Sequence, residues 1–322
     1  MDKWIFNRLF KTKKRPQPRF AYQSTVSWMR ALAILCRSDS FSNKDLKAFY
    51  KNVQRRRVDI QADTWVYKNI LMALQNIAAL NEMSSQKVDH NAIAISAIIT
   101  WYYAIYYSSS AMIAATSGST QKTHAGTIKL LHEDIISKKL AVGPFGLSLE
   151  TLVPKKVESN IKSLKNGTNF KLIKMPTNET EAWGAAYSYL SGTADHEKEK
   201  KEEDIKKDNK EFKNLGVSNF LGGKAKHLRD LILDSGRVNF LTQSYRYRLK
   251  ANYKDPIYLA YGENRTESIK VLVEDLNFVA VTYLKMACHY VSKRVEKGTW
   301  VSFIEDLEQN LTVDIDLNII KT

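Results

Sequence analysis

The sequence has little cysteine and none of the short motifs that mark the common cofactor sites. Its two cysteines, Cys36 and Cys288, lie far apart in the chain, which excludes a disulfide scaffold and indicates a reducing, cytoplasmic environment. The P-loop phosphate motif, the glycine-rich dinucleotide motif, the GxSxG nucleophile motif and zinc-type cysteine spacing are all missing. We therefore expect no cofactor.

The N-terminal residues do not have the pattern of a secretory signal, and the composition is not that of a disordered chain. The apolar stretch at Trp4 to Phe6 gives way to charged residues after Phe10, which is too early for the apolar region of a signal peptide. With 44% hydrophobic and 26% charged residues, the 322-residue chain has an ordinary globular composition. It is long enough for a substantial core.

Positive charge is concentrated at one end of the chain. Residues 1–60 hold 15 Lys and Arg against 4 Asp and Glu, whereas the rest of the chain is nearly balanced. Such a region favours RNA, DNA or a membrane surface as partner, although a solubilising basic tail would look the same. The clearest candidates for nucleic-acid binding are Lys13, Lys14, Arg15, Arg55, Arg56 and Arg57.

Residues 91–121 contain no charged side chain and predict one long, buried helix. A membrane span has this length. However, Ser96, Thr100, Tyr103, Tyr107 and Ser110 recur every three or four residues and form one polar stripe, which favours a helix inside a bundle, facing a cavity or a symmetry mate. We therefore consider membrane association unlikely, and expect Gly118 and Ser119 to end the helix.

Hydrophobic periodicity predicts a mainly α fold. Further helices are expected at 21–37, 64–83, 122–139 and 267–296. Glycine and proline punctuate residues 141–192, which predicts an irregular insertion with a hairpin near Asn166-Gly167, and the 195–213 run of mixed charge predicts a solvated helix or a mobile linker. The final residues VDIDLNII could form one strand. We divide the chain into a basic N-terminal region (1–60), a first bundle part (61–140), an insertion with charged linker (141–225), a second bundle part (226–298) and a C-terminal helix and tail (299–322).

Two clusters carry candidate chemistry. The first joins Tyr103 and Tyr107 to Lys122 and His124, just beyond the predicted end of the helix. The second interleaves arginine with tyrosine, which offers charge to phosphates and flat faces to bases, although the same tyrosines could simply pack in the core; it comprises Tyr245, Arg246, Tyr247, Arg248, Asn252 and Tyr253. His124 and His132 are too far apart on one helix to predict a metal site.

Three segments, taken in order, resemble the HEPN (higher eukaryotes and prokaryotes nucleotide-binding) superfamily. They are IITWYYAIYYSSSAMI at 98–113, KTHAGTI at 122–128 and RLKANYKDP at 248–256, with the long helix 267–296 closing the series. HEPN proteins are α-helical bundles that act as prokaryotic toxins, defence nucleases or nucleotide-binding partners. The resemblance therefore implies a HEPN-like bundle, a homodimer, and a role in antiviral defence or a toxin–antitoxin system.

The chain departs from the family at the catalytic motif. Nuclease members carry arginine followed by histidine after four to six residues, and no arginine here has that partner. We therefore expect a module that binds nucleic acid, a nucleotide or a protein partner. The alternative is a metal-independent endoribonuclease with a rearranged site, in which Arg246 and Arg248 hold phosphate, His124 is base or acid, and Tyr253 orients the substrate. A third option is an interfacial anchor at residues 1–20.

Overall fold

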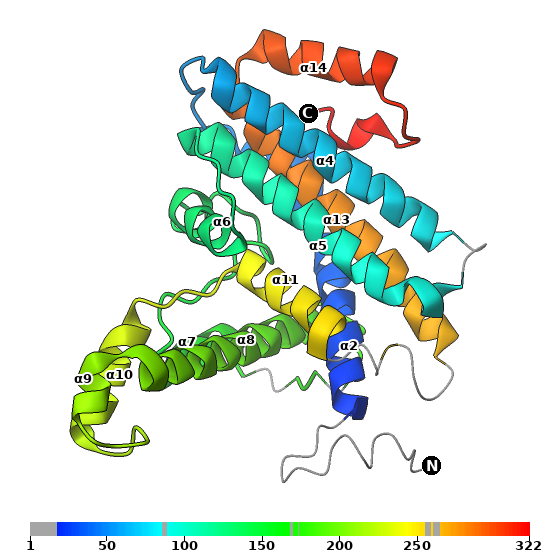
Figure 1. Cartoon of the computed structure of the whole chain (residues 1–322). Coiled ribbons are helices and arrows are strands. Elements are labelled where there is room, and N and C mark those ends of the chain that lie inside the picture. Colours follow the sequence, from blue (N-terminus) through cyan, green and yellow to red (C-terminus); the bar gives the residue numbers. More distant parts are fainter. Residues whose placement is uncertain (1–17, 86–88, 168–169, 173, 255–258, 260–264) are drawn as a thin grey trace.

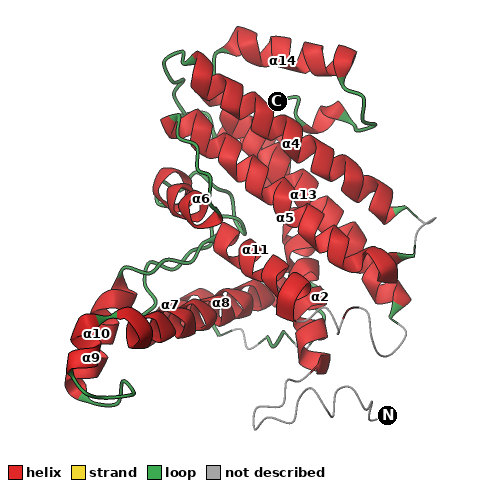
Figure 2. Cartoon of the chain, viewed as in Figure 1, coloured by secondary structure: helices red, strands yellow, loops and turns green. Residues whose placement is uncertain are grey.

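The computed structural model describes residues 18–85, 89–167, 170–172, 174–254, 259 and 265–322, and its class is all-α (Figure 1, Figure 2). The predicted mainly α class is therefore confirmed. The described helical segments are α2 (Pro18–Cys36), η1 (Asp39–Phe41), α3 (Asn43–Phe49), α4 (Ile60–Ser84), α5 (His90–Ser117), α6 (His124–Leu131), η2 (His132–Ile136), α7 (Pro154–Lys165), α8 (Glu179–Asp208), α9 (Lys210–Asn214), α10 (Gly223–Asp234), α11 (Phe240–Leu249), η3 (Lys250–Lys254), α13 (Thr266–Arg294), α14 (Lys297–Asn310) and η4 (Leu317–Ile319).

The uncharged segment forms α5, the central helix of the bundle. It packs along α4 on one side and α13 on the other, and α11 and α6 cover part of the remainder (Figure 1). Trp101, Ile105 and Met112 are completely buried. Burying so much apolar surface stabilises the bundle and explains why the helix contains no charge.

A glycine in the left-handed region ends α5, as predicted. Gly118 has φ 71°, a backbone conformation that costs other residues energy, and its amide donates to the Ala114 carbonyl at 3.0 Å. The turn directs the chain toward α6, where Thr123 caps the new helix by accepting a hydrogen bond from the Gly126 amide. This short connection sets the position of His124.

Two arginines bind the carboxyl end of α5. Arg56 Nε and Arg294 Nε each donate to the Ala115 carbonyl at 3.2 Å, and Arg294 also donates to the Thr116 carbonyl. These contacts place positive charge at the negative end of the helix dipole. Arg56 also pairs with Asp63, and both side chains are nearly buried. Arg56 is thus a structural residue in this fold.

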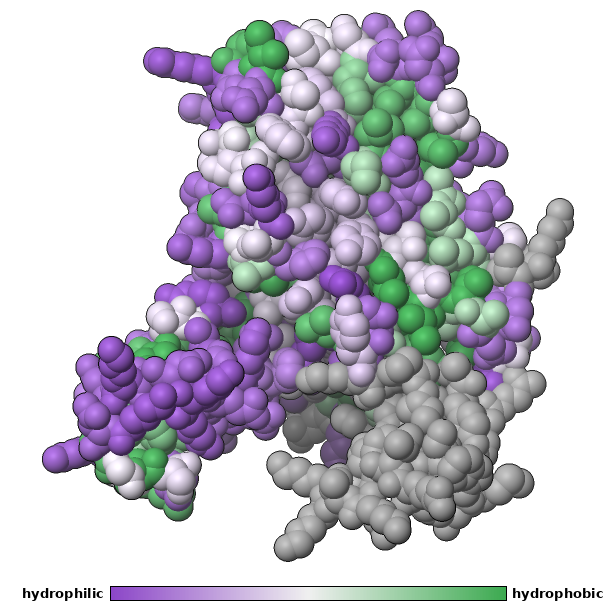
Figure 3. Space-filling model, viewed as in Figure 1, coloured by the Kyte–Doolittle hydropathy of each residue, from purple (hydrophilic) through white to green (hydrophobic). Residues whose placement is uncertain are grey.

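The insertion is more regular than the sequence pattern predicts. Residues 195–208 of the charged run form the second half of the continuous helix α8, and residues 210–213 lie in α9, so the helix alternative is the one that the structure shows. Ile205 is the buried residue in its exposed half and joins Phe212, Phe220 and Ala225 in a small apolar cluster, which anchors the helix. The ends of α8, α9 and α10 form the densely hydrophilic region at the lower left of Figure 3.

Two smaller predictions are wrong. Asn166, with φ 41°, is the left-handed C-cap of α7, so the turn at Asn166-Gly167 ends a helix and does not join two strands. The VDIDLNII tail contains the 3₁₀ turn η4 and no strand; it packs Ile320 into the core. Within the described residues no strand forms, and Leu149 and Val238 make a single isolated β-bridge.

None of the described helices combines the length and apolarity that a membrane span requires. On α5, the five members of the polar stripe are not fully buried: Ser96 is exposed and the other four are partly accessible. In Figure 3, pale residues of intermediate hydropathy lie over the middle of this face, where Figure 1 shows α5. Most of the rest of α5 is enclosed by its own bundle.

Candidate functional site

The helices α5, α6 and α11 contact one another (Figure 1). His124 lies among them, in contact with Tyr102 of α5 and Arg248 of α11. It is the first residue of α6, half-buried, and its Nδ1 is 2.8 Å from the hydroxyl oxygen of Tyr102 on α5. The rings of Tyr106 and Tyr245 have centroids 5.0 and 5.2 Å from the imidazole. The histidine therefore stands in an aromatic surround that still opens to solvent.

Arg248, which lies on α11, also contacts His124. Its Nη1 is 3.4 Å from His124 Nε2, so the structure brings together an arginine and a histidine that are distant in sequence. The guanidinium carbon lies 5.2, 5.4 and 5.8 Å from the ring centroids of Tyr102, Tyr103 and Tyr245. At these distances the negative faces of the rings attract the cation.

The contacts of His124 indicate which ring nitrogen of the neutral imidazole carries the proton. A guanidinium can only donate, so His124 Nε2 accepts from Arg248 and the imidazole proton is on Nδ1, where it faces the Tyr102 hydroxyl. Burial, and then the charge of Arg248, lower the pKa of His124 below its ordinary value. Burial also raises the pKa of Tyr102. At neutral pH the site thus holds a neutral imidazole, a protonated phenol and one cation.

Arg248 has no negatively charged partner in the described part of the chain. Its Nε is buried without a hydrogen-bond acceptor, and no carboxylate forms an ion pair with it. The similarly enclosed Arg56 and Arg229 each contact a carboxylate. A partly buried cation without an anion is costly unless a ligand supplies one. The geometry is that of an anion-binding site.

Arg246 lies away from this site. Its Nη1 donates to Thr193 Oγ1 at 3.1 Å, and its guanidinium lies over the ring of Tyr189 on α8. Residues two apart on a helix point about 200° apart, so Arg246 and Arg248 face different neighbours. Tyr253 lies in the π-helical turn η3 and is 67% exposed, with no described contact to His124 or Arg248.

The residues proposed from the sequence to bind nucleic acid are divided in space. Lys13, Lys14 and Arg15 lie outside the described residues. Arg55 and Arg57 are exposed, whereas Arg56 points inward to Asp63 and Ala115. Lys122 is exposed two residues before His124, and Tyr103 lies against Arg248.

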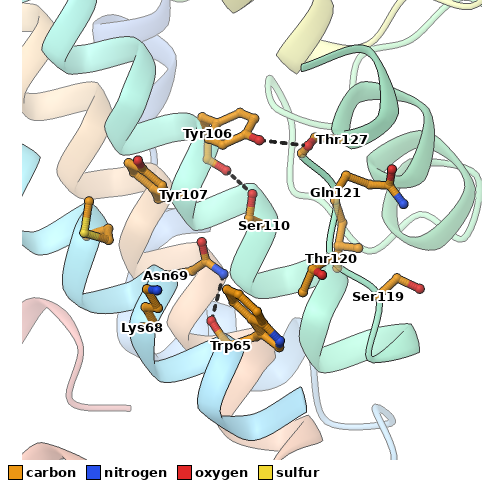
Figure 4. Close-up of a pocket in the computed structure, with 12 residues that line it drawn as sticks. Trp65, Lys68, Asn69, Tyr106, Tyr107, Ser110, Ser119, Thr120, Gln121 and Thr127 are labelled. Carbon is orange, nitrogen blue, oxygen red and sulfur yellow. Dashed lines mark hydrogen bonds between the residues drawn. The ribbon is translucent and has the colours of Figure 1, made fainter. Parts of the chain in front are cut away.

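Tyr107 lies on a neighbouring pocket of about 280 Å³, shown in Figure 4. The pocket lies between α4, α5 and the 119–121 connection, and Tyr106 forms part of its wall. The Tyr106 hydroxyl accepts a hydrogen bond from Thr127 Oγ1 at 3.1 Å. The Tyr106 ring also contacts the His124 imidazole, with 5.0 Å between the ring centroids. The pocket and the His124–Arg248 site are therefore adjacent.

Sequence reasoning missed several residues that complete the site. Tyr102 and Tyr106 were not singled out, although their four-residue spacing places them on one helix face toward α6. Trp65 and Lys68 on α4 gave no signal, because their approach to α5 depends on helix packing. Tyr245 was noticed only as part of the arginine–tyrosine run.

The described residues contain no group of three or more His, Cys, Asp or Glu side chains placed to hold a metal ion. His132 Nε2 lies 3.0 Å from a carboxylate oxygen of Glu150, so His132 and His124 contact different partners. Comparison with models of protein families, with curated proteins and with solved structures finds no match to this chain. The functional interpretation therefore depends on the site itself.

Proposed function

We propose that this protein is a HEPN-like RNA-binding module whose His124–Arg248 site holds a phosphodiester group. The observation that carries the proposal is the Arg248 guanidinium, which is surrounded by three tyrosine rings and has no carboxylate partner among the described residues. A phosphate would supply the missing negative charge and accept hydrogen bonds from the guanidinium.

The surroundings favour a nucleic acid over a free anion. Exposed Lys122 is two residues from His124 in the chain, and the excess of Lys and Arg in residues 1–60, with exposed Arg55 and Arg57 among them, adds a general attraction for a polyanion. Tyrosine faces beside the phosphate site can stack on bases, as in single-strand binding grooves. The resemblance to HEPN proteins adds an expected setting in antiviral defence or a toxin–antitoxin pair, and an expected homodimer.

A matched pair of arginine variants tests the proposal. We expect Arg248→Gln to weaken binding of a fluorescein-labelled single-stranded RNA by at least about thirtyfold, because losing one partner of an enclosed charge pair costs about 2–5 kcal/mol. Arg246→Gln removes the same charge two residues away but outside the site, so it should weaken binding by less than about threefold. Fluorescence anisotropy at fixed salt gives both values, and equal losses in the two variants would refute the site assignment.

Metal-independent RNA cleavage is the second candidate, and the contact between His124 and Arg248 favours it. In this step the phosphate replaces His124 as the acceptor for Arg248, which frees Nε2 of the neutral imidazole. Nε2 then takes the proton of a ribose 2′-hydroxyl while the 2′-oxygen attacks phosphorus, the bond to the 5′-oxygen breaks, and a cyclic phosphate forms. The departing 5′-oxygen then takes a proton from the imidazolium or from water. Arg248 would stabilise the extra charge on the phosphoryl oxygens in the transition state.

Cleavage is tested by incubating RNA with the protein in the presence of a chelator. Chelator-resistant cleavage that is lost in His124→Ala and Arg248→Ala, but retained in Arg246→Ala, would establish the nuclease. Intact RNA that still binds in a salt-sensitive manner would leave the binding module alone. Circular dichroism of each variant checks that the bundle remains folded.

A further inference from the structure

Apart from Tyr106, the pocket in Figure 4 is built from groups outside the His124–Arg248 site. The side chains of α4 and α5 face the 119–121 connection across it, with Trp65, Tyr106 and Tyr107 as its aromatic members. Trp65 is 36% exposed, which is high for the largest apolar side chain in a fold that buries Trp28 and Trp101 almost completely. The Trp65 indole lines the pocket and is partly exposed, so a ligand in the pocket can reach it.

The polar groups of the pocket are also available. Lys68 Nζ lies 5.2 Å from the Trp65 ring centroid and forms no ion pair within the described residues. Asn69 donates to the Trp65 carbonyl at 2.7 Å, which leaves its Oδ1 without a partner in the described part of the chain. Gln121 adds a second amide, and the residues that line the pocket include no Asp or Glu. The lining therefore combines flat rings, two amides and one cation.

We propose that this pocket binds a single nucleobase of the RNA strand whose adjacent phosphate is held by Arg248. This inference rests on the function proposed above and names the part of the substrate that the second cavity takes. Two connections place the base site beside the phosphate site: Tyr106 contributes to both, and the Tyr107 ring lies 6.0 Å from that of Tyr103, which contacts Arg248.

The size and chemistry of the pocket select a base over other ligands. A cavity of about 280 Å³ is at the lower end of the range of small-molecule sites, so it admits one ring system with part of its sugar and excludes a longer stretch of strand. Aromatic walls stack on any base. Amides of Asn69 and Gln121 can pair with the donors and acceptors on a base edge, which is how proteins recognise bases extruded from single-stranded RNA.

The test compares oligoadenylate with an abasic ribose-phosphate oligomer of equal length. We expect Trp65→Ala to weaken binding of oligoadenylate by about tenfold, the effect of losing one stacked base, while binding of the abasic oligomer changes by less than twofold. Trp65→Phe keeps an aromatic face and should retain most of the affinity. Because Trp65 lies at the surface of α4, we expect both variants to fold, and circular dichroism checks this.

The two proposals fail in different ways. If Arg248→Gln weakens both oligomers but Trp65→Ala weakens neither, the phosphate site stands and the base pocket is refuted. If Trp65→Ala weakens the two oligomers equally, the indole does not contact a base and the inference is likewise refuted. If Arg248→Gln leaves both affinities unchanged, or if neither oligomer binds, the proposed function fails and the base pocket falls with it.

Discussion

Protonation of His124 should make RNA binding depend on pH in a direction that separates the two candidate functions. The free imidazole is neutral at pH 7, because burial and Arg248 lower its pKa. A phosphate placed on Arg248 would bring negative charge to the ring and raise that pKa. Binding would therefore take up a proton, and affinity should increase as the pH falls toward and below the ordinary histidine range.

The magnitude follows from the composition of the site. The groups that face His124 are Tyr102, Tyr103, Tyr106 and Tyr245, together with Arg248. Histidine is the side-chain type that ordinarily changes its charge between pH 5 and 8, and burial raises the pKa of Tyr102 further above that range, so we assign the effect to the imidazole. Uptake of at most one proton limits the change to about tenfold in affinity per pH unit, which corresponds to about 1.4 kcal/mol.

Anisotropy titrations of labelled oligouridylate from pH 5 to pH 8 would measure this slope, since uracil takes up no proton in that range. The control is His124→Gln, which keeps a polar side chain beside Tyr102 but does not titrate, and whose slope should be near zero. If the wild-type protein and this variant show the same slope, the assignment of His124 is refuted. Cleavage by a neutral His124 would show the opposite sign, with a rate that rises with pH and then levels off.

Two further predictions concern stability. Arg56→Ala should lower the free energy of unfolding by about 3–5 kcal/mol, because it leaves the buried Asp63 unpaired. Arg57→Ala, at an exposed position, should change that free energy by less than about 0.5 kcal/mol. Urea denaturation measures both, and equal effects would contradict the structural role of Arg56. Burial raises the pKa of Asp275 to about 6 despite the attraction of Arg30, so its folded-state pKa exceeds the unfolded one and stability is lost as pH rises through that value. Relative to Asp275→Asn, the wild type should lose about 2 kcal/mol between pH 4 and pH 7, and a difference that is constant with pH would contradict this.

The central helix was the element most open to prediction from the sequence. A charge-free run from 91 to 121 with Gly118 near its end defines both the burial of α5 and its termination, because burying charge is costly and a left-handed C-cap favours glycine. The second half of α8 was harder to predict. Its 195–208 sequence has no apolar face apart from Ile205, and its helix is held by the small cluster around Phe212 and Phe220, which local periodicity does not reveal.

The sequence analysis named some residues of the candidate site but did not show which of them lie together. It named both His124 and Arg248, and the structure places Arg248 Nη1 3.4 Å from His124 Nε2. Arg246 was grouped with Arg248 because the two are neighbours in sequence. Helical rotation separates them, and the register of α11 against α5 decides which one reaches His124; that register depends on packing across the whole bundle.

The choice of tyrosine around Arg248 follows from the need to hold a cation without neutralising it. A carboxylate in the place of Tyr102 or Tyr103 would bind the guanidinium more strongly, but it would also cancel the charge and repel an incoming phosphate. Ring faces attract the cation through their quadrupoles, and burial raises the pKa of the Tyr102 phenol, which therefore stays uncharged at neutral pH. The positive potential of Arg248 is therefore stabilised and still available to an anion. The structural Arg56 is held differently: it is paired with the Asp63 carboxylate, which neutralises its charge.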